Sequence, residues 1–383
     1  MQIYKLPDGD TIHHYKKSIV VIFSGKRHVI STGPNNGGYR EDLQAVFNHD
    51  DNPGPGMACI MRDSTYEGHM NLVALEDLGL KPEKCSGLCT AASMDNVSIK
   101  SMKYRELTVT AIVTAGIEHN GGRAGDPAVY YEENEIFYDL TEKRYDHQTE
   151  TPSPGTINVI LHINAALDAG TLARTIMTVT EAKTAALQEL RARSHNSKGL
   201  ATGSGTDGII TIANPSSSLK LTNAGKNSKL GELIGKTVME ATKEALFRQS
   251  GLCPEKQRDV LRIMGRYGIN EDVLWEEYQR AVLKPFDTHH TDVDESAENS
   301  GREMTKAVFI DCLDRLKTSP EMVEQAFLYV HVMDLLEWGL ISPEEALQMA
   351  DRILSGKPAE EKCTEGQDGL MDKYICYLLG HME

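Results

Sequence analysis

The sequence predicts an α+β fold, with a layered sheet-and-helix domain over residues 1–250 and a smaller all-helical domain over residues 251–383. Three observations predict it. Short apolar strands and glycine-rich turns fill the first half of the chain, a helical periodicity lies between two such strands, and amphipathic helices replace the strands beyond Arg248. With 383 residues, the chain is long enough for each domain to bury its own core.

The N-terminal third is expected to consist of strands and turns. Ile19–Phe23 and Arg27–Ser31 are apolar segments on either side of Ser24-Gly25-Lys26, which suggests a hairpin. The cluster Gly33–Gly38 predicts a turn because Asn and Gly tolerate positive φ. Residues 131–154 are acidic and rich in tyrosine, which is typical of a solvated surface segment, and the alternative is that the tyrosines stack on a large planar ligand.

A further strand is expected over Leu107–Ile117, where threonine alternates with apolar residues, and it leads into a polar loop that ends at Asp126. Arg123 in this loop has two interpretations. Its guanidinium group could hold a carboxylate or amide oxygen of a ligand by a forked hydrogen bond, or it could pair with Asp126 and stiffen the loop.

The central segment carries the densest set of polar groups. A short strand over Asn158–Ile163 precedes a helix over Ala169–Leu190, whose apolar residues recur every three or four positions. The glycine-broken turn Ala201–Gly208 then leads into a second strand, Ile209–Ala213. Hydroxyl groups next to fixed charges in this segment indicate a site for a polar substrate.

Composition excludes several classes of partner. The chain is 40% hydrophobic and 25% charged, and its formal charge of −16 argues against binding nucleic acid or an anionic membrane surface. The longest apolar runs, such as Ser18–Phe23, are far shorter than the roughly 20 residues of a membrane helix. The N-terminus lacks an apolar signal core, so we expect a cytoplasmic protein with a small-molecule partner. Seven scattered cysteines without a CxxC pair indicate reduced thiols.

Three motifs resemble known binding sites, but the residues around them do not form the structure that such a site requires. Gly203–Gly208 matches G-x-G-x-x-G but leads into a strand, so it does not predict a dinucleotide site. Gly235-Lys236-Thr237 resembles the end of a Walker A loop, but it lies in a helix-periodic run with the preceding glycine, Gly231, one residue too close. His289 and His290 stand among acidic residues in an expected linker, where a metal site is the less favoured interpretation. No metal is therefore expected.

Several ordered motifs carry a family resemblance. TEAKTAAL at Thr180–Leu187, ATGSGTD at Ala201–Asp207 and KLGELIG at Lys229–Gly235 resemble the adenosylcobinamide amidohydrolase family of cobamide salvage, as do GLCTAA at Gly87–Ala92 and GTIN at Gly155–Asn158. The resemblance covers residues 17–250. It implies hydrolysis of the amide that joins a corrin propionyl side chain to aminopropanol, giving adenosylcobyric acid and 1-amino-2-propanol. The adenosylated corrinoid is then the substrate, and no separate cofactor is expected.

The expected substrate-binding residues lie in these motifs and in the turns around them. They are Asn36, Gly37, Gly38, Asn48, Arg123, Asp126, Asn158, Thr202, Ser204 and Thr206. The family usually has threonine at the position of Ser204, which keeps the hydroxyl group. The segment Gly225–Ser228 lacks the threonine and histidine that the family usually has there, which puts a catalytic histidine in doubt.

Amide hydrolysis needs a nucleophile or activated water, donors for the oxyanion and a proton for the leaving amine. Asp207 or Glu181 could be the base, and Lys183 the acid or oxyanion partner. Helical spacing places Thr180 and Lys183 on one face and Glu181 on another. A threonine nucleophile served by Lys183 and a water activated by Asp207 both remain open.

The last third of the sequence predicts five helices, with polar loops over Thr288–Gly301 and Ser355–Gly369. The helices are expected at Glu255–Tyr267, Glu271–Val282, Arg302–Leu316, Pro320–Trp338 and Pro343–Leu354. Short segments here loosely resemble the archaeal α-ribazole-phosphate phosphatase domain that is fused to this amidohydrolase in some proteins. An interaction or dimerisation module, giving a homo-oligomer, is the plainer interpretation. For the whole chain, the alternative to an enzyme is a corrinoid carrier that kept the binding residues and lost the chemistry, and the intact TEAKTAAL and GSGTD motifs favour the enzyme.

Overall fold

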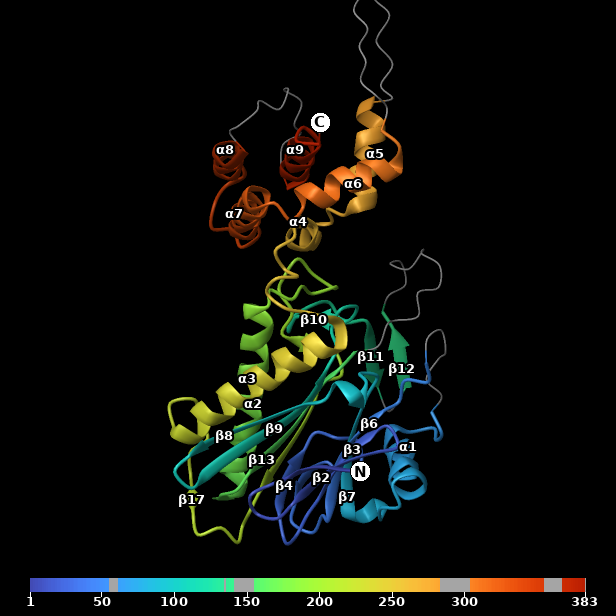
Figure 1. Ribbon diagram of the computed structural model, residues 1–383, viewed down its shortest axis with the longest axis vertical. Coiled ribbons are helices and arrows are strands. Elements are labelled where there is room, and N and C mark those ends of the chain that lie inside the picture. The colour runs from blue at the N-terminus through green and yellow to red at the C-terminus, as the bar shows by residue number, and fades with distance from the viewer. Residues whose placement is uncertain (55–60, 134–135, 141–154, 283–303, 355–366, 383) are drawn as a thin grey trace, which may run out of the picture. The chain divides into compact units, whose positions relative to one another are not determined.

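The computed structural model describes residues 1–54, 61–133, 136–140, 155–282, 304–354 and 367–382. The chain divides into two compact units, Met1–Pro254 and Glu255–Glu383. The first unit combines sheets with helices, and the described part of the second is helical (Figure 1). The predicted α+β fold class with a helical C-terminal region is thus confirmed.

A five-stranded sheet forms much of the N-terminal half of the first unit. Its strands lie in the order β1-β2-β3-β6-β7, and only the β6–β7 pair is parallel. The bounds are Gln2–Lys5 (β1), Thr11–Tyr15 (β2), Ser18–Ile22 (β3), Ala45–Asp50 (β6) and Cys85–Thr90 (β7). The short helix α1, Tyr66–Leu72, continues into a π-helical turn, Val73–Asp77.

A six-stranded sheet forms the second layer of strands. Its order is β5-β4-β16-β13-β9-β8, with β13 parallel to β16 and antiparallel to β9. The bounds are Gly38–Arg40 (β5), His28–Ser31 (β4), Gly208–Ala213 (β16), Ile157–Ile163 (β13), Leu107–Ala115 (β9) and Ser98–Tyr104 (β8). In this register Asn158 lies opposite Thr114 on one side and Gly208 on the other.

The hairpin predicted around Ser24-Gly25-Lys26 is wrong. The strand before this segment, β3, pairs with β2 and β6 in the five-stranded sheet, whereas the strand after it, β4, pairs with β5 and β16 in the other sheet. The segment is therefore a crossover between sheets. The physical reason is that Ser24 and Arg27 bind the Asp10 carboxylate, which directs the chain away from a tight turn.

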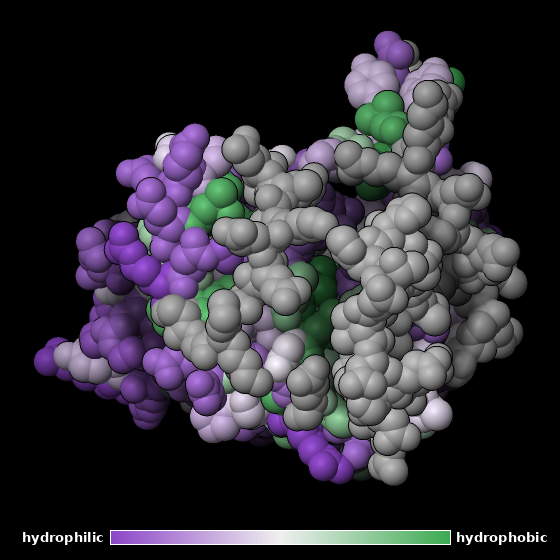
Figure 2. Space-filling view, turned by 90° about the horizontal axis from the view of Figure 1, so that it is seen from above, coloured by the Kyte–Doolittle hydropathy of each residue, from purple (hydrophilic) through white to green (hydrophobic). Residues whose placement is uncertain are grey.

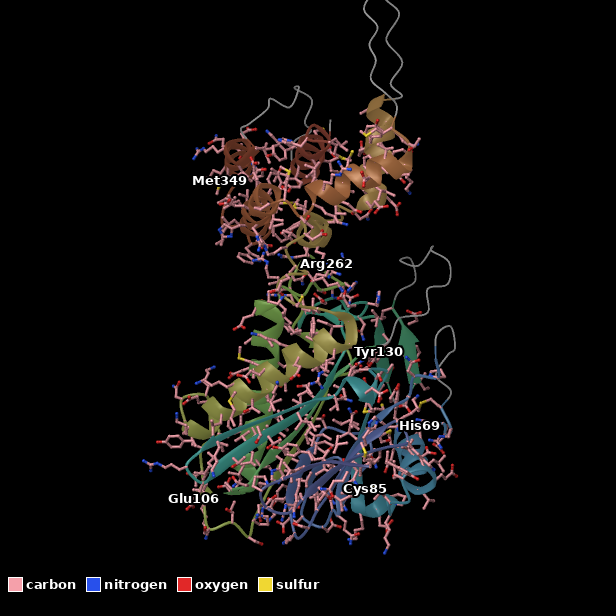
Figure 3. All side chains as sticks on the ribbon, viewed as in Figure 1. His69, Cys85, Glu106, Tyr130, Arg262 and Met349 are labelled. Atoms are coloured by element: carbon pink, nitrogen blue, oxygen red, sulfur yellow. The ribbon has the colours of Figure 1, made fainter. Side chains whose placement is uncertain are left out.

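Three clusters of buried apolar residues hold the layers of this unit together. The helices α2, Ala169–Glu189, and α3, Lys229–Ser250, pack on one face of the six-stranded sheet through residues such as Leu161 and Leu172. A second core joins the two sheets, and a third lies between the five-stranded sheet and α1. The layers therefore follow in the order α2 and α3, six-stranded sheet, five-stranded sheet and α1 (Figure 1). Figure 3 labels His69 and Cys85 in the region of α1. Every residue of β9 and β13 is buried, because the two strands are covered on both faces, and their buried positions include threonine, asparagine and histidine as well as apolar residues.

The central strands and helix were predicted correctly. The N-cap of α2 is Asp168, whose carboxylate accepts from Thr171 N, and α3 is capped by Ser228 at its start. Three two-stranded ladders complete the unit: β10 (Gly121–Gly122) with β15 (Gly203–Ser204), β11 (Tyr130–Glu133) with β12 (Ile136–Asp139), and β14 (Ala166–Leu167) with β17 (Lys220–Leu221). The described part of the 131–154 segment is exposed at Tyr131 and Tyr138, as expected for a surface segment.

The second unit packs its helices around one core that includes Met264, Phe309, Tyr329 and Tyr374. The described helices are α4 (Val260–Met264), α5 (Glu271–Val282), α6 (Lys306–Leu316), α7 (Pro320–Glu337), α8 (Pro343–Leu354) and α9 (Gln367–Leu379).

Two details of the second unit differ from the prediction. The first helix begins at Val260 and not at Glu255, because the Asp259 carboxylate caps it by accepting from Leu261 N and Arg262 N. The helix α9 is not among the predicted helices, and its first residues, 367–369, fall in the predicted polar loop. The apolar spacing of Leu370, Tyr374 and Leu378 marked this helix, and all three side chains are buried.

Two expectations concern the surface and the cysteines. No described helix combines the length and the apolar character that crossing a membrane requires. The coloured atoms in the space-filling view are largely hydrophilic, with the green areas broken up among them (Figure 2). Among the described cysteines, Cys85, Cys253 and Cys312 are free thiols. His289 and His290 lie outside the described residues.

Candidate functional site

The Asp207 carboxylate is the centre of a dense polar cluster at the start of β16. Its Oδ2 atom accepts from Lys183 Nζ and from Ser204 N at 3.0 Å. Its Oδ1 atom accepts from Ile157 N at 2.9 Å and from Ser204 Oγ at 2.7 Å. A carboxylate offers about four lone-pair positions, so these donors fill the acceptor capacity of Asp207.

Lys183 reaches this carboxylate from the middle of α2. Its side chain is 8% exposed and that of Asp207 is 12% exposed, so the two charges form a largely buried ion pair. Gly203 makes the approach possible, because a Cβ atom at this position would collide with Asp207 Oδ2 and lie 2.6 Å from Lys183 Nζ. Removing either charge would leave the other one buried without its partner.

Hydroxyl groups surround the ion pair. Ser204 is half-buried, and its Oγ atom also accepts from Thr206 N at 3.3 Å. The hydroxyl groups of Thr206 and Thr156 lie 2.8 Å apart. Thr202 is held on both sides, since its carbonyl accepts from Thr184 Oγ1 and its own Oγ1 accepts from Ala124 N.

The Arg123–Asp126 loop lies beside this cluster because β10 pairs with β15. The Asp126 carboxylate accepts from Arg123 N at 2.7 Å and from Ser194 Oγ at 2.6 Å. Burial raises the pKa of this carboxyl group, but hydrogen bonds from Ser194, Ser197 and Arg123 outweigh burial and hold the pKa below its ordinary value. The Arg123 guanidinium group donates to Leu200 O at 3.3 Å. Asp126 thus stiffens the loop through the backbone of Arg123.

Two asparagines connect the two sheets immediately next to Asp207. Asn158 Nδ2 donates to Asn48 Oδ1 at 2.7 Å and to Cys89 O at 2.8 Å, and Asn48 Nδ2 donates to Thr114 Oγ1 at 2.8 Å. Asn48 and Asn158 are 3% and 1% exposed. Their amides therefore bind protein groups in the core and hold β6, β7, β9 and β13 together.

The Asn36-Gly37-Gly38 turn is anchored to a different part of the unit. Asn36 has φ of 50°, and its Nδ2 atom donates to Pro82 O and Cys85 O at 2.7 and 2.8 Å. Its Oδ1 atom accepts from Arg40 Nη1 at 2.6 Å. Gly37 and Gly38 are exposed, and because glycine has no side chain their exposed surface is backbone, whereas Asn36 is half-buried.

The four proposed catalytic residues separate into two pairs. Lys183 and Asp207 contact each other, whereas Thr180 and Glu181 are exposed. The Thr180 hydroxyl group donates to Ile176 O at 2.9 Å, and Glu181 accepts from Lys226 Nζ at 3.0 Å. Helical spacing placed Thr180 and Lys183 on one face of α2, but the helix turns Lys183 into the core and leaves Thr180, like Glu181, exposed to solvent.

Sequence reasoning missed several residues of this region. Thr156 and the Ile157 N–H group were not singled out, although GTIN was quoted as a motif, and Thr114 was passed over in a strand of alternating threonines. The structure also brings together Asp8, Asp10 and His162 at another part of the same unit. An Asp-Gly-Asp turn was the only signal for that group.

The similarity to known protein families covers the first unit of the chain. A model of the family described as adenosylcobinamide amidohydrolase matches residues 3–254. The uncharacterized protein MJ1613 of Methanocaldococcus jannaschii is 36% identical over 251 residues, which is 64% of this chain and 93% of that protein.

Similarities to solved structures are much weaker. The PH0078 protein from Pyrococcus horikoshii OT3 is 14% identical with a TM-score of 0.33, covering 70% of this chain and 91% of that one. The L-aminopeptidase D-Ala-esterase/amidase from Ochrobactrum anthropi, described as a variant of the Ntn hydrolase fold, is 12% identical with a TM-score of 0.31, covering 68% and 87%. Neither similarity is strong enough to bear on the chemistry. The family match spans nearly the whole first unit, and the chain belongs to the adenosylcobinamide amidohydrolase family.

Proposed function

We propose that the amide bond of adenosylcobinamide is hydrolysed at the Lys183–Asp207–Ser204 cluster. The observation that carries this proposal is a largely buried ion pair whose carboxylate also accepts from the hydroxyl group of a half-buried serine. An acid, a base and a hydroxyl relay then lie within one hydrogen-bonded unit, which is the set that amide hydrolysis requires.

The proton transfers can be written so that they balance. Water attacks the amide carbon and gives a proton to Ser204, which passes its own hydroxyl proton to Asp207 Oδ1. Lys183 donates a proton to the leaving nitrogen as the C–N bond breaks, so that 1-amino-2-propanol departs. Asp207 then returns a proton to Lys183 across their contact, and the new carboxyl group stays on the corrin side chain. No covalent enzyme intermediate is needed in this scheme.

In this proposal Asp207 receives the proton through Ser204 and not directly from water. The reason is its saturated hydrogen bonding, since all four acceptor positions are filled by protein donors. Lys183 can approach the oxyanion as well as the leaving amine, because an ammonium group carries three donors and Asp207 uses one of them.

The turn that follows Ser204 supports the approach of a bulky substrate. Gly205 is exposed, and no atom lies within 4 Å of where its Cβ would stand. Thr206 and Thr202 flank this opening, with the Arg123–Asp126 loop beside them, so we propose that these residues contact the corrinoid. Asn48 and Asn158 act on the site by positioning strands, and Asn36–Gly38 contributes exposed backbone.

The free thiols support a cytoplasmic enzyme.

The test is turnover by the full-length protein. Purified protein is incubated with adenosylcobinamide, and the corrinoid carboxylate and 1-amino-2-propanol are followed by chromatography. Ser204→Ala should lower kcat by about a hundredfold, the scale of lost proton-transfer help, while Ser204→Thr should keep most of the rate because it retains the hydroxyl group. Ser216→Ala, at an exposed serine elsewhere in the unit, is the matched control.

The same experiment separates the enzyme from a corrinoid carrier. A carrier would bind adenosylcobinamide stoichiometrically and release it unchanged after long incubation. Wild-type rates in Ser204→Ala would instead keep the activity and remove the relay from the mechanism.

A further inference from the structure

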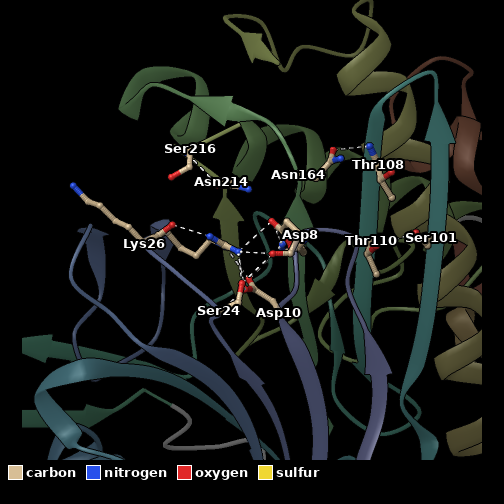
Figure 4. A network of polar contacts seen from close by, with 12 residues as sticks. Asp8, Asp10, Ser24, Lys26, Ser101, Thr108, Thr110, Asn164, Asn214 and Ser216 are labelled. Carbon is tan, nitrogen blue, oxygen red and sulfur yellow. Dashed lines mark hydrogen bonds and ion pairs between the residues drawn. The ribbon is translucent and has the colours of Figure 1, made fainter. Parts of the chain in front are cut away.

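A second polar cluster is buried between the two sheets, away from the residues of the proposed hydrolytic site. Asp8 and Asp10 flank Gly9 in the turn between β1 and β2, where φ of 94° at Gly9 favours glycine. His162 lies on β13, four residues after Asn158, and is completely buried. Figure 4 shows Asp8 and Asp10 close together with Ser24 in this network.

Three metal-ligating atoms converge here from two separate segments. His162 Nε2 lies 3.1 Å from Asp8 Oδ2 and 3.5 Å from Asp10 Oδ2, and one ligand atom of each residue lies within 4.8 Å of the others. Ligands bound about 2.1 Å from a first-row divalent ion stand roughly 3.0 to 3.4 Å apart, the edge of an octahedron or tetrahedron. The His162 distances are close to that spacing.

The hydrogen bonding of this cluster is incomplete among the described residues. Both ring nitrogens of His162 and both carboxylate oxygens of Asp8 are buried without a hydrogen-bond partner. The short His162–Asp8 distance is thus not an aligned hydrogen bond. Four buried polar atoms without a hydrogen bond are costly, although Asp8 Oδ2 and His162 Nε2 have ion-pair contacts, and a bound ion would satisfy those atoms that face it.

Arg27 balances part of the acidic charge. It binds Asp10 with two hydrogen bonds, Nε to Oδ2 at 2.9 Å and Nη2 to Oδ1 at 2.7 Å. Its Nη2 atom is 3.4 Å from Asp8 Oδ2. One guanidinium group therefore faces two buried carboxylates, and its directed bonds go to Asp10. The negative charge of Asp8 is therefore compensated less completely than that of Asp10, so Asp8 is the carboxylate that a bound cation would stabilise more.

We propose that Asp8, Asp10 and His162 bind one divalent first-row metal ion, with Zn²⁺ and Mn²⁺ as the candidates that suit an imidazole and carboxylate ligand set. The ion would join the β1–β2 turn to β13 and so connect the two sheets. Because the ligands are buried, its effect is on the stability of the fold, and the proton transfers at Ser204 do not involve it.

The test measures metal content and thermal stability of the full-length protein. Protein purified without chelators or a metal column is stripped with EDTA, reloaded with Zn²⁺ or Mn²⁺, desalted, and analysed by mass spectrometry of the metal. About one ion per chain should be retained, with a higher melting temperature than the stripped protein, because metal binding is coupled to folding. His162→Gln and Asp8→Asn should each lower the affinity at least about tenfold. His49→Gln is the matched control, since His49 is also buried beside an aspartate, Asp51, but lies outside the cluster.

Each result decides the question. Retention by the wild type and by His49→Gln, with loss in both cluster variants, supports the site, and if His162→Gln fails to fold, Asp8→Asn and the metal-dependent melting of the wild type still test it. A wild-type protein that retains neither ion and melts at the same temperature with or without them would overturn the proposal and leave a protonated His162 as the counter-charge. Equal retention by the wild type and both cluster variants would also overturn it, because the ion would then be bound elsewhere.

Discussion

Lys183, in the middle of α2, donates to Asp207, in the turn before β16, and the two form a largely buried ion pair. This contact joins the helix layer to the ends of two central strands of the six-stranded sheet, where β13 and β16 begin, since Asp207 also accepts from Ile157 N. The family motifs TEAKTAAL and ATGSGTD, which are separate in the sequence, thus meet at one ion pair.

The first prediction concerns this ion pair. Lys183→Ala and Asp207→Asn should each lower kcat by at least about a hundredfold, because each removes one partner of the proton transfer. Single-turnover rates on folded protein, with circular dichroism melts beside them, would measure chemistry and stability separately. Glu181→Gln and Thr180→Ala are the matched controls on the exposed face of α2 and should keep near wild-type rates. An inactive but normally folded Glu181→Gln, beside an active Asp207→Asn, would make Glu181 the base.

A second prediction concerns the amide bridge between the sheets. Thr114→Val removes the acceptor of Asn48 Nδ2 and leaves a buried donor unpaired, so the free energy of unfolding should fall by about 1–3 kcal/mol. Urea denaturation would measure it. The exposed Thr180→Ala variant should change stability by less than about 0.5 kcal/mol. A Thr114→Val protein as stable as the wild type would mean that Asn48 finds another acceptor.

The third prediction is a pH dependence that arises from Asp126. Its folded-state pKa lies below the ordinary value of 3.8, so the group stabilises the fold above that pH and the contribution is lost as the pH falls through the lower folded pKa. Asp126→Asn should therefore be less stable than the wild type near neutral pH, and the two proteins should converge in acid. Urea titrations at several pH values would measure the difference. A constant difference at all pH values would show that the charge of Asp126 does not contribute.

The fourth prediction concerns Cys85. Burial, together with the nearby charge of Glu83, raises the pKa of this thiol to about 12, so it stays protonated at pH 8. Iodoacetamide should label Cys85 slowly in the native protein and rapidly after denaturation, because the thiolate is the reactive form. The exposed Cys376 serves as the internal comparison. Mass spectrometry of peptides would give both rates, and rapid native labelling of Cys85 would contradict the burial.

The fifth prediction concerns the division of the chain. A protein ending at Pro254 should fold and hydrolyse adenosylcobinamide, because the first unit and the family match both end there. A protein ending at Ser250 should be less stable by about 1.5–3 kcal/mol, because it lacks the buried Leu252 of the first core. Melting curves, kcat/KM and gel filtration would compare both with the full chain. A folded but inactive 1–254 protein would show that the helical unit contributes to activity.

The sequence by itself determined the fold class, the central strand–helix–strand segment and the family. Each depends on a local signal, such as the periodicity of α2, the glycines of the turn before β16, or the order of short motifs. The helix positions in the second unit followed from the same kind of signal, and α9 was missed although its apolar spacing was present. Helices, strands and turns can be predicted from such local patterns, because the conformation of the backbone depends strongly on residues that are close in the sequence.

Only the tertiary structure decided which distant groups meet. The crossover at Ser24 depends on hydrogen bonds with Asp10 and Arg27. The hydrogen bonds that fill the acceptor positions of Asp207 include one from Ile157 N. His162 contacts Asp8 and Asp10, which lie far from it in the sequence. Helical spacing placed Thr180 beside Lys183, yet packing buried one and exposed the other. Strand register and layer packing set these contacts, and neither is encoded in the spacing of residues along one element.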